Sequence, residues 1–218
     1  MNVLIAGAGR LGAEVAQVLS ASGNTVTVVD PDQMRLDALR GRFAARLVLG
    51  DASEAAVQAR AEVAHAALVV AATGQDEDNL VISLIAKRRF GVSRVAARVN
   101  DDENAWLFDH HWGVDVAVPA ATPLVSLIEE ATGATDTVAL MRLSSAGVGI
   151  VETTITEESS SAGLPLGDVE LPGGTMVATV VRAGQPTAPR PDLILRPGDE
   201  LLLVSHAAGE QEIHSAFQ

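Results

Sequence analysis

The sequence predicts an α/β fold, a doubly wound parallel sheet followed by a second, smaller α+β domain. Up to about residue 118, short apolar runs alternate with stretches of helical periodicity, as expected for parallel strands and the helices that connect them. After residue 137 the chain changes to β-rich segments with Gly, Pro and Asp at their junctions. This change indicates a separate domain.

The first domain is expected to be a six-stranded sheet. Its predicted strands are continuous apolar runs, which is typical of strands covered by helices on both faces. The strands are expected at 2–6, 25–29, 46–49, 67–71, 94–99 and 114–118, and the helices at 10–22, 31–42, 54–62, 77–90 and 102–112.

A further helix is expected at 124–131, directly after the sheet is complete. Its apolar positions fall on one face, and Thr132-Gly133 provides a C-terminal capping signal. We expect that face to dock on a second subunit; packing on its own domain is the alternative. The apolar positions are Leu124, Leu127, Ile128 and Ala131.

The β-rich part is expected to contain four strands and a terminal helix. Domain boundaries follow at 1–119 for the first domain, 120–136 for a crossover helix and linker, and 137–218 for the second domain. The strands are expected at 138–143, 150–155, 175–182 and 200–204, and the helix at 209–217.

Composition excludes several classes of function. The formal net charge is −13, with 28 acidic against 15 basic residues, which argues against a nucleic-acid partner because phosphate binding needs a basic surface. The absence of cysteine excludes disulfides, thiolate metal sites and cysteine nucleophiles. No apolar run reaches the roughly 18 to 20 residues of a membrane span. The sequence therefore predicts a soluble, intracellular protein.

The glycine-rich segment after the first predicted strand is the strongest functional signal. Gly7, Gly9 and Gly12 form a GxGxxG motif that opens a helical pattern, and Asp30 closes the next apolar run. In a Rossmann-like fold these glycines permit a tight turn, close approach of a phosphate and helix-on-strand packing. The helix N-terminus favours an anion. The segment Gly7-Ala8-Gly9-Arg10-Leu11-Gly12 therefore predicts a nucleotide site.

Asp30 is expected to accept hydrogen bonds from the ribose hydroxyls, with helix capping as the alternative. A carboxylate there repels a 2′-phosphate, and Pro31 offers no compensating cation. The site is therefore expected to prefer NAD or an adenine nucleotide over NADP.

Other candidate ligands lie at the carboxyl ends of the predicted strands. A cation at Arg10 is opposed by the helix dipole, so we expect it to contact a phosphate rather than only solvent. Thr73 and Gly74 are candidates for ribose or phosphate contact, or for a simple turn. Arg98 is expected at a phosphate, with a salt bridge to a nearby aspartate as the alternative. Asp76, Glu77 and Asp78 need no function beyond favouring a helix start.

No metal site is expected. His110 and His111 are adjacent, and adjacent residues on an α-helix point about 100° apart, which makes a shared ion difficult. Histidines in a last helical turn are instead favoured by the helix dipole.

The chain resembles a known two-domain family over nearly its whole length. Val29-Asp30, Gly50-Asp51-Ala52, Ala71-Ala72-Thr73, Asp78-Asn79 and Ala97-Arg98-Val99, together with residues 4–12, resemble the N-terminal nucleotide-binding RCK domain (regulator of potassium conductance). Residues 162–167, Leu171-Pro172, 180–182 and the RPGDEL turn at 196–201 resemble the C-terminal RCK domain. The arrangement is similar to Trk- or Ktr-type (RCK/KTN) potassium transport regulatory subunits.

The resemblance implies a cytosolic, nucleotide-sensing regulatory subunit that gates a membrane-embedded potassium uptake channel or transporter from the inner face of the cell membrane. It implies NAD(H) or ATP/ADP at the glycine-rich loop, with Asp51 beside the adenine, Ala52 among the cofactor-binding residues and Arg10 reaching phosphates across a dimer. For Asp51, capping of the helix that starts near Ser53 is the alternative. Dimers would form through the helix at about 120–132 and assemble into an octameric ring or a mixed ring with a sister subunit.

The resemblance also implies candidate ligands outside the glycine-rich loop. Some C-terminal domains bind cyclic di-AMP or metal ions; Arg182 and Arg196 are the anion candidates here, with solvated strand ends as the alternative. In Ktr-type relatives a Glu after the proline that ends the sheet resembles a cation ligand, whereas this chain has Ala120. An intersubunit cation site at that position is therefore in doubt.

The alternative function is an NAD-dependent oxidoreductase. Such an enzyme needs an acid or base opposite the nicotinamide. The second domain offers His206 and His214 but no Tyr and no Lys. We therefore expect the chain not to be an enzyme.

Overall fold

The computed structural model describes residues 1–132, 135–143, 148–206 and 208–218. It divides into two compact units, Met1–Ala121 and Thr122–Gln218, each with its own hydrophobic core. Within the described residues, no helix is long and apolar enough to cross a bilayer.

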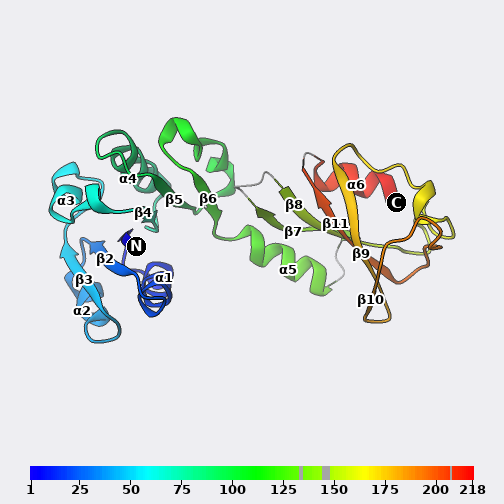
Figure 1. Ribbon diagram of the computed structural model, residues 1–218, viewed down its shortest axis with the longest axis horizontal. Helices are drawn as coiled ribbons and strands as arrows, with labels where there is room; N and C mark the ends of the chain where they lie inside the picture. Colours follow the sequence, from blue (N-terminus) through cyan, green and yellow to red (C-terminus); the bar gives the residue numbers. More distant parts are fainter. Residues whose placement is uncertain (133–134, 144–147, 207) are drawn as a thin grey trace. The chain divides into compact units, whose positions relative to one another are not determined.

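The first unit is a parallel six-stranded sheet with the strand order β3-β2-β1-β4-β5-β6 (Figure 1). The order reverses direction between β1 and β4, which makes the carboxyl ends of these strands the switch point of the fold. The predicted doubly wound α/β fold is confirmed. The strands are β1 (Asn2–Ala6), β2 (Thr25–Asp30), β3 (Ala45–Leu49), β4 (Leu68–Ala71), β5 (Arg94–Val99) and β6 (Val116–Pro119).

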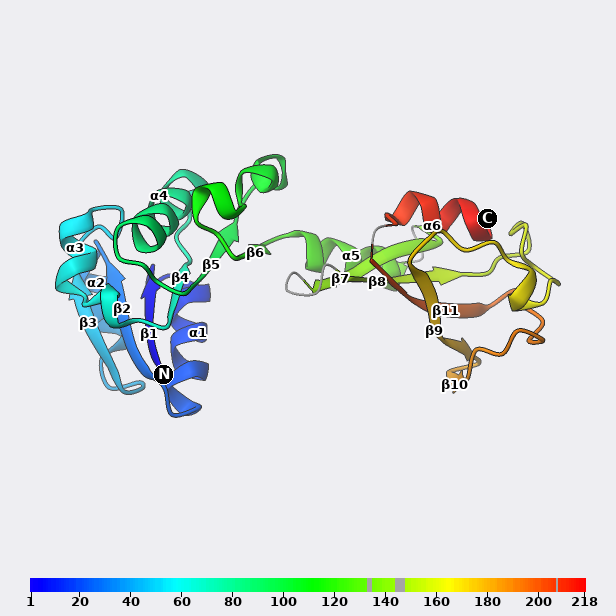
Figure 2. The ribbon, with the colours of Figure 1, turned by 45° about the horizontal axis from the view of Figure 1, so that its top comes forward.

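Helices cover both faces of this sheet because the apolar strands supply side chains to both. In β1, Val3 and Ile5 enter one core, whereas Leu4 and Ala6 enter the other. Helices α1 (Arg10–Ala21) and α2 (Gln33–Leu39) pack in the first core, and α3 (Ala55–Arg60) and α4 (Asp76–Arg88) in the second. Figure 2 shows α1 and α4 on opposite sides of β1.

The prediction of a helix at 102–112 is wrong. The segment forms two 3₁₀ helices, η2 (Asp102–Leu107) and η3 (His110–Trp112). The side chain of Asp109 accepts hydrogen bonds from the backbone N–H of His111 and Trp112, and this local bonding competes with a continuous helix. Gly113 then ends the segment with a φ of 79°.

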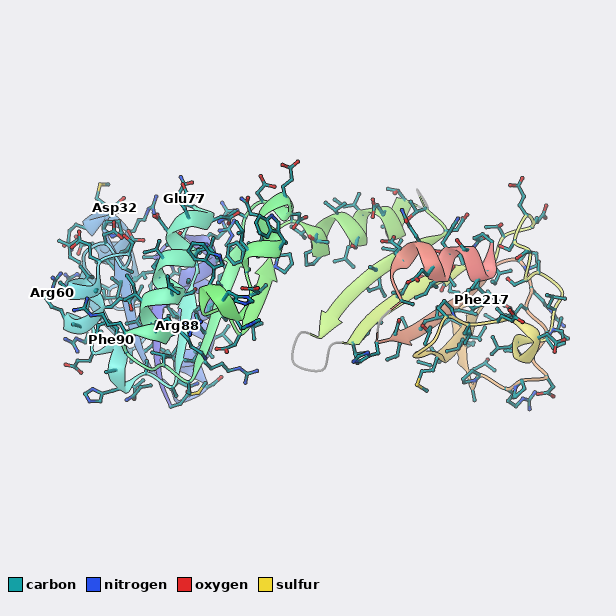
Figure 3. The ribbon with its side chains drawn as sticks, turned by 90° about the horizontal axis from the view of Figure 1, so that it is seen from above. Asp32, Arg60, Glu77, Arg88, Phe90 and Phe217 are labelled. Atoms are coloured by element: carbon teal, nitrogen blue, oxygen red, sulfur yellow. The ribbon has the colours of Figure 1, made fainter. Side chains whose placement is uncertain are left out.

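The second unit contains a five-stranded antiparallel sheet with the strand order β10-β9-β11-β8-β7. In β11, alternate residues such as Leu201 and Leu203 are fully buried, and α6 adds Ile213 and Phe217 to the same core. Figure 3 labels Phe217 at the end of α6. The elements are β7 (Thr137–Leu143), β8 (Val148–Thr154), η4 (Leu166–Asp168), β9 (Thr175–Arg182), β10 (Gln185–Thr187), β11 (Asp199–Ser205) and α6 (Glu210–Phe217).

The four expected strands and the terminal helix of this unit are present, and β10 is an addition. Its three residues are all exposed and include Pro186, so they carry neither an apolar run nor an alternating pattern. A second, smaller α+β domain is confirmed.

Helix α5 (Thr122–Thr132) belongs to the second unit. Its predicted apolar face is exposed on the single chain: Leu124, Leu127 and Ile128 are 63%, 54% and 62% accessible. Gly133 of the predicted capping signal lies outside the described residues.

Candidate nucleotide-binding site

A cavity of about 580 Å³ lies at the switch point of the first unit. The loops after β1 and β4 form part of its wall, where ligands bind in doubly wound folds. Every predicted site residue except Ala8 and Gly12 lines it: Gly7, Gly9, Arg10, Leu11, Asp30, Asp51, Ala52, Thr73, Gly74 and Arg98.

The three motif glycines have distinct surroundings. Gly7 has a φ of 106°, and a Cβ there would lie 2.8 Å from the carbonyl oxygen of Ala72. A Cβ at Gly12 would overlap the carbonyl of Gly7, so this glycine lets α1 pack closely on the loop. A Cβ at Gly9 would meet nothing within 4 Å, and Gly9 faces the cavity. The middle glycine therefore keeps space open at the start of α1.

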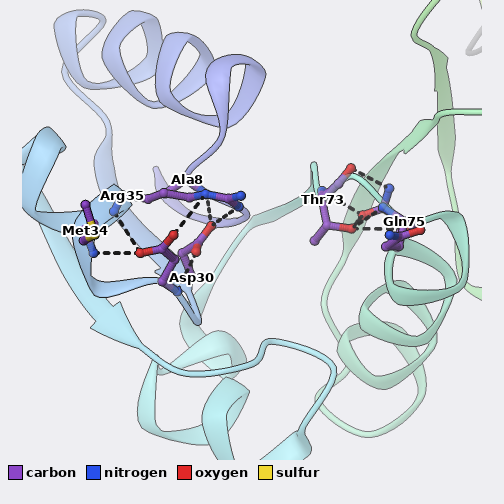
Figure 4. Close-up of polar contacts among 8 residues, drawn as sticks. Ala8, Asp30, Met34, Arg35, Thr73 and Gln75 are labelled. Carbon is purple, nitrogen blue, oxygen red and sulfur yellow. Dashed lines mark hydrogen bonds and ion pairs between the residues drawn. The ribbon is translucent and has the colours of Figure 1, made fainter.

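Asp30 fixes the glycine-rich loop from the end of β2. Its side chain is almost fully buried: Oδ2 accepts a hydrogen bond from the N–H of Ala8 at 2.6 Å, and Oδ1 one from the N–H of Asp32 at 2.8 Å (Figure 4). Ala8 thus contributes through its backbone without lining the cavity. Asp32, not Asp30, caps α2 by accepting a hydrogen bond from the N–H of Met34. The capping alternative for Asp30 is therefore wrong.

Arg35 is a lining residue that sequence reasoning missed. Its Nη1 lies 3.8 Å from Oδ2 of Asp30 (Figure 4), and its side chain is 58% exposed. The expected discrimination against a 2′-phosphate assumed no cation near Asp30, and this assumption is wrong. The signal was available, because Arg35 lies in the first turn of the helix that follows Asp30.

Two arginines lie where phosphates are expected. Arg10 begins α1, whose N-terminus has no side-chain cap. Arg98 is the last residue but one of β5 and lines the cavity, and its Nε is buried without a hydrogen-bond partner. A buried, unsatisfied donor is costly, so its position on a cavity wall favours an anionic ligand there.

Asn79 joins the loop after β4 to the end of β5. Its Oδ1 accepts hydrogen bonds from the N–H and the hydroxyl of Thr73 at 2.9 and 2.8 Å, and its Nδ2 donates to the carbonyl oxygen of Arg98 at 2.9 Å. The Thr73 hydroxyl also lies 3.0 Å from the carbonyl of Gln75 (Figure 4). The Thr73 side chain therefore shapes the wall through internal hydrogen bonds.

A neighbouring acid, Asp76, organises the next loop. It is buried and accepts four hydrogen bonds, from the N–H and Nδ2 of Asn100, the N–H of Asp101 and Nδ2 of Asn104. Burial alone raises the pKa of Asp76, but these hydrogen bonds outweigh it and lower the pKa below its ordinary value. Asp76 was expected to do no more than favour the start of a helix. In the structure it also holds the loop after β5 through these hydrogen bonds.

Asp51 and Asp78 form an acidic part of the cavity wall. Burial and then the charges of Asp51 and Glu77 raise the pKa of Asp78. Oδ1 of Asp51 accepts a hydrogen bond from the N–H of Ser53 in a turn, whereas Glu54 is the N-cap residue of α3. Asp78 at the cavity was not predicted, because its position at a helix start explained it equally well.

In the second unit, Asp199 of the RPGDEL turn binds the side chain of Arg182 at the end of β9 and the backbone of Arg196 within the turn. Asp199 is fully buried and accepts hydrogen bonds from Nε and Nη2 of Arg182 at 2.6 and 2.7 Å and from the N–H of Arg196 at 2.8 Å. Burial raises the pKa of Asp199, but the hydrogen bonds from Arg182 and Arg196 lower it overall. Arg182 is therefore a structural ion-pair partner, which differs from both expected interpretations.

Comparisons with known proteins agree with this two-part architecture. Residues 3–120 match the TrkA-N domain and residues 150–218 match the TrkA-C domain. The chain is 39% identical over 213 residues to a Trk system potassium uptake protein TrkA of Mycobacterium tuberculosis, covering 98% of this chain and 96% of the relative. It is 27% identical to the Streptomyces coelicolor protein of the same name, covering 100% and 96%.

Solved structures share the fold at lower identity. The GsuK channel bound to NAD superposes with a TM-score of 0.59 at 21% identity, covering 98% of this chain and 38% of that one. The Shewanella denitrificans Kef C-terminal domain in its AMP-bound form gives 0.51 at 24% identity, covering 62% and 81%.

The fold and the domain matches define a two-domain protein with a Rossmann-like TrkA-N domain followed by a TrkA-C domain. The chain belongs to the TrkA family of Trk system potassium uptake proteins. The expected resemblance is thereby confirmed.

Proposed function

We propose that the chain is a nucleotide-sensing regulatory subunit that acts at the cytoplasmic face of the membrane on a membrane-embedded potassium transporter. Family membership supports the role in potassium uptake. The observation that carries the nucleotide proposal is the cavity at the switch point. It combines the buried Asp30 carboxylate with the unpartnered Nε of Arg98.

The ligand that this cavity fits is NAD(H) or ATP/ADP. The carboxylate of Asp30 is the acceptor for ribose hydroxyls, and the start of α1 with Arg10 and Arg98 is the place for phosphates. Asp51 and Ala52 are proposed beside the adenine. NAD and AMP are also the ligands named for the two fold relatives above.

Gating follows from differential binding. A nucleotide shifts the assembly only by its difference in affinity for two arrangements, about 1.4 kcal/mol for each tenfold difference. We propose dimers through α5 that form an octameric ring or a mixed ring with a sister subunit, with Arg10 contacting phosphate across the dimer. Ligand identity would then change dimer geometry.

The proposed function involves no turnover. Among the described residues that line the cavity there is no His, Lys or Tyr to act as an acid or base opposite a nicotinamide. The measurable consequence is that NADH is bound without being consumed.

The test is calorimetric titration of the full chain with NAD, NADH, ATP, ADP and NADPH. Arg98→Ala is expected to weaken the affinity for the tightest-binding nucleotide at least tenfold. Arg94→Ala is the matched control, because Arg94 is exposed at the other end of the same strand. Failure of every nucleotide to bind, or equal loss in both variants, contradicts the proposal. Steady NADH consumption with a substrate would instead favour an oxidoreductase.

A further inference from the structure

Three side chains with metal-binding atoms meet on the surface of the first unit, in the segment where a helix was expected. Asp109, His110 and His111 each offer one donor atom, and these atoms lie within 4.8 Å of one another. Across the described part of the chain, this is the one group of three or more such residues.

The geometry of η3 removes the reason for expecting no metal here. The prediction placed the two histidines on an α-helix, where adjacent side chains diverge. In the structure their ring centroids are 3.9 Å apart and the ring planes are inclined by 40°. His111 is also 73% exposed, so its ring is accessible from solvent.

Asp109 has one oxygen available beyond its structural role. Its Oδ1 accepts hydrogen bonds from the N–H of His111 at 2.8 Å and of Trp112 at 3.4 Å, which hold the turn. Its Oδ2 lies 2.8 Å from Nδ1 of His111. An ion bound between Oδ2 and Nδ1 therefore leaves the backbone contacts of the turn in place.

We propose that Asp109, His110 and His111 bind a divalent transition-metal ion. Imidazole nitrogen and carboxylate oxygen bind such ions at about 2.0 to 2.2 Å, so two donors at a right angle lie about 3 Å apart, close to the Oδ2–Nδ1 separation. Imidazole suits Ni²⁺, Cu²⁺ and Zn²⁺, whereas Mg²⁺ and Ca²⁺ prefer oxygen. Rotation of the exposed His110 side chain supplies the third ligand, and water completes the coordination.

This site is separate from the nucleotide cavity, since none of its three residues lines that cavity. It also does not depend on the proposed function. A metal result therefore neither supports nor contradicts nucleotide binding.

The experiment is titration of the chelator-treated full chain, without nucleotide, with Ni²⁺, Cu²⁺ and Zn²⁺ alone. Calorimetry gives stoichiometry and affinity. Tryptophan fluorescence gives a local readout, because Trp112 directly follows the site and the chain has 2 tryptophans. We expect one ion per chain, quenching by Ni²⁺ and Cu²⁺, and no competition from Mg²⁺.

His110→Ala and His111→Ala are each expected to weaken binding at least tenfold. His110→Ala is the sharper test, because it keeps the side-chain contact between Oδ2 of Asp109 and Nδ1 of His111, which His111→Ala removes. The matched control is His65→Ala, which removes an exposed histidine at the end of another 3₁₀ helix, η1 (Val63–His65). Thermal unfolding without metal verifies that each variant is folded. Absence of binding to the wild type at 100 µM metal, or equal loss in the control, overturns the proposal.

Discussion

Gly9 and Gly12 belong to one motif but differ in what surrounds them. A side chain at Gly9 would project into open cavity space, and one at Gly12 would overlap backbone. We expect Gly9→Ala to change the free energy of unfolding by less than about 0.5 kcal/mol and to weaken nucleotide binding about tenfold or more. Gly12→Ala is expected to cost about 3 kcal/mol of stability.

Chemical denaturation and calorimetric titration of both glycine variants check these values. Unchanged nucleotide affinity in a folded Gly9→Ala variant would contradict the placement of the ligand at the start of α1.

Arg35 makes a prediction about cofactor choice. A cation 3.8 Å from Asp30 offsets the repulsion between that carboxylate and a 2′-phosphate. We expect Arg35→Ala to weaken the binding of NADPH more than that of NADH. The difference is limited to about tenfold because the Arg35–Asp30 ion pair is partly exposed. Competition binding measures the ratio. Arg40→Ala, which removes an exposed arginine paired with Asp37 at the end of the same helix, is the control and is expected to leave the ratio unchanged.

At the scale of single elements, the loop from β5 into η2 depends on one carboxylate. The pKa of Asp76 is lower in the folded chain than in the unfolded one, so its contribution to stability is complete above the unfolded value of about 4. That contribution is lost as the pH falls through the folded pKa. Asp76→Asn is therefore expected to lose less stability than wild type between about pH 5 and pH 2.

Urea denaturation at a series of pH values measures this difference. Glu77→Gln, which alters a neighbouring acid in the first turn of α4, is the control for net charge. Identical pH dependence of wild type and Asp76→Asn would show that the Asn100 and Asn104 hydrogen bonds do not act through the charge of Asp76.

Elements with a strong apolar pattern were predictable from sequence, and those formed by local polar contacts were not. The strands β1 and β4 are apolar apart from Asn2, and β2 and β5 bury their valines; all four strands were located within a residue. The segment at 102–112 has helical length, but the Asp101 side chain caps a first 3₁₀ helix and the Asp109 side chain caps a second one within the segment, so no continuous α-helix forms.

The candidate site divides in the same way. Residues at or just after strand ends, such as Asp30 and Thr73, were predicted because parallel strands end at one edge. Arg35 and Asp78 lie in the first turns of the helices that follow two of these strands. That position was a signal for both, but the packed orientation of the helices decides that their side chains reach the cavity.

For the whole molecule, the exposed face of α5 predicts a homodimer. Leu127 and Ile128 are more than half exposed, and monomeric proteins rarely leave such a contiguous apolar surface uncovered. Ile128→Asp is expected to convert dimers to monomers at micromolar concentration, as measured by light scattering. Leu164→Asp, at an exposed leucine elsewhere in the second unit, is expected to leave the mass unchanged. A monomeric wild type would contradict this assignment.

The side-chain amide of Asn79 links two strand ends that are far apart in sequence. It holds the peptide of Thr73 and the carbonyl of Arg98 from the first turns of α4. A ligand that displaces Arg98 is therefore expected to displace the Thr73 loop and α4 as well, because Asn79 is hydrogen-bonded to both strand ends. We expect the Thr73 loop, the end of β5 and α4 to shift together when a ligand binds in the cavity, so that the C-terminal end of α4 moves as well.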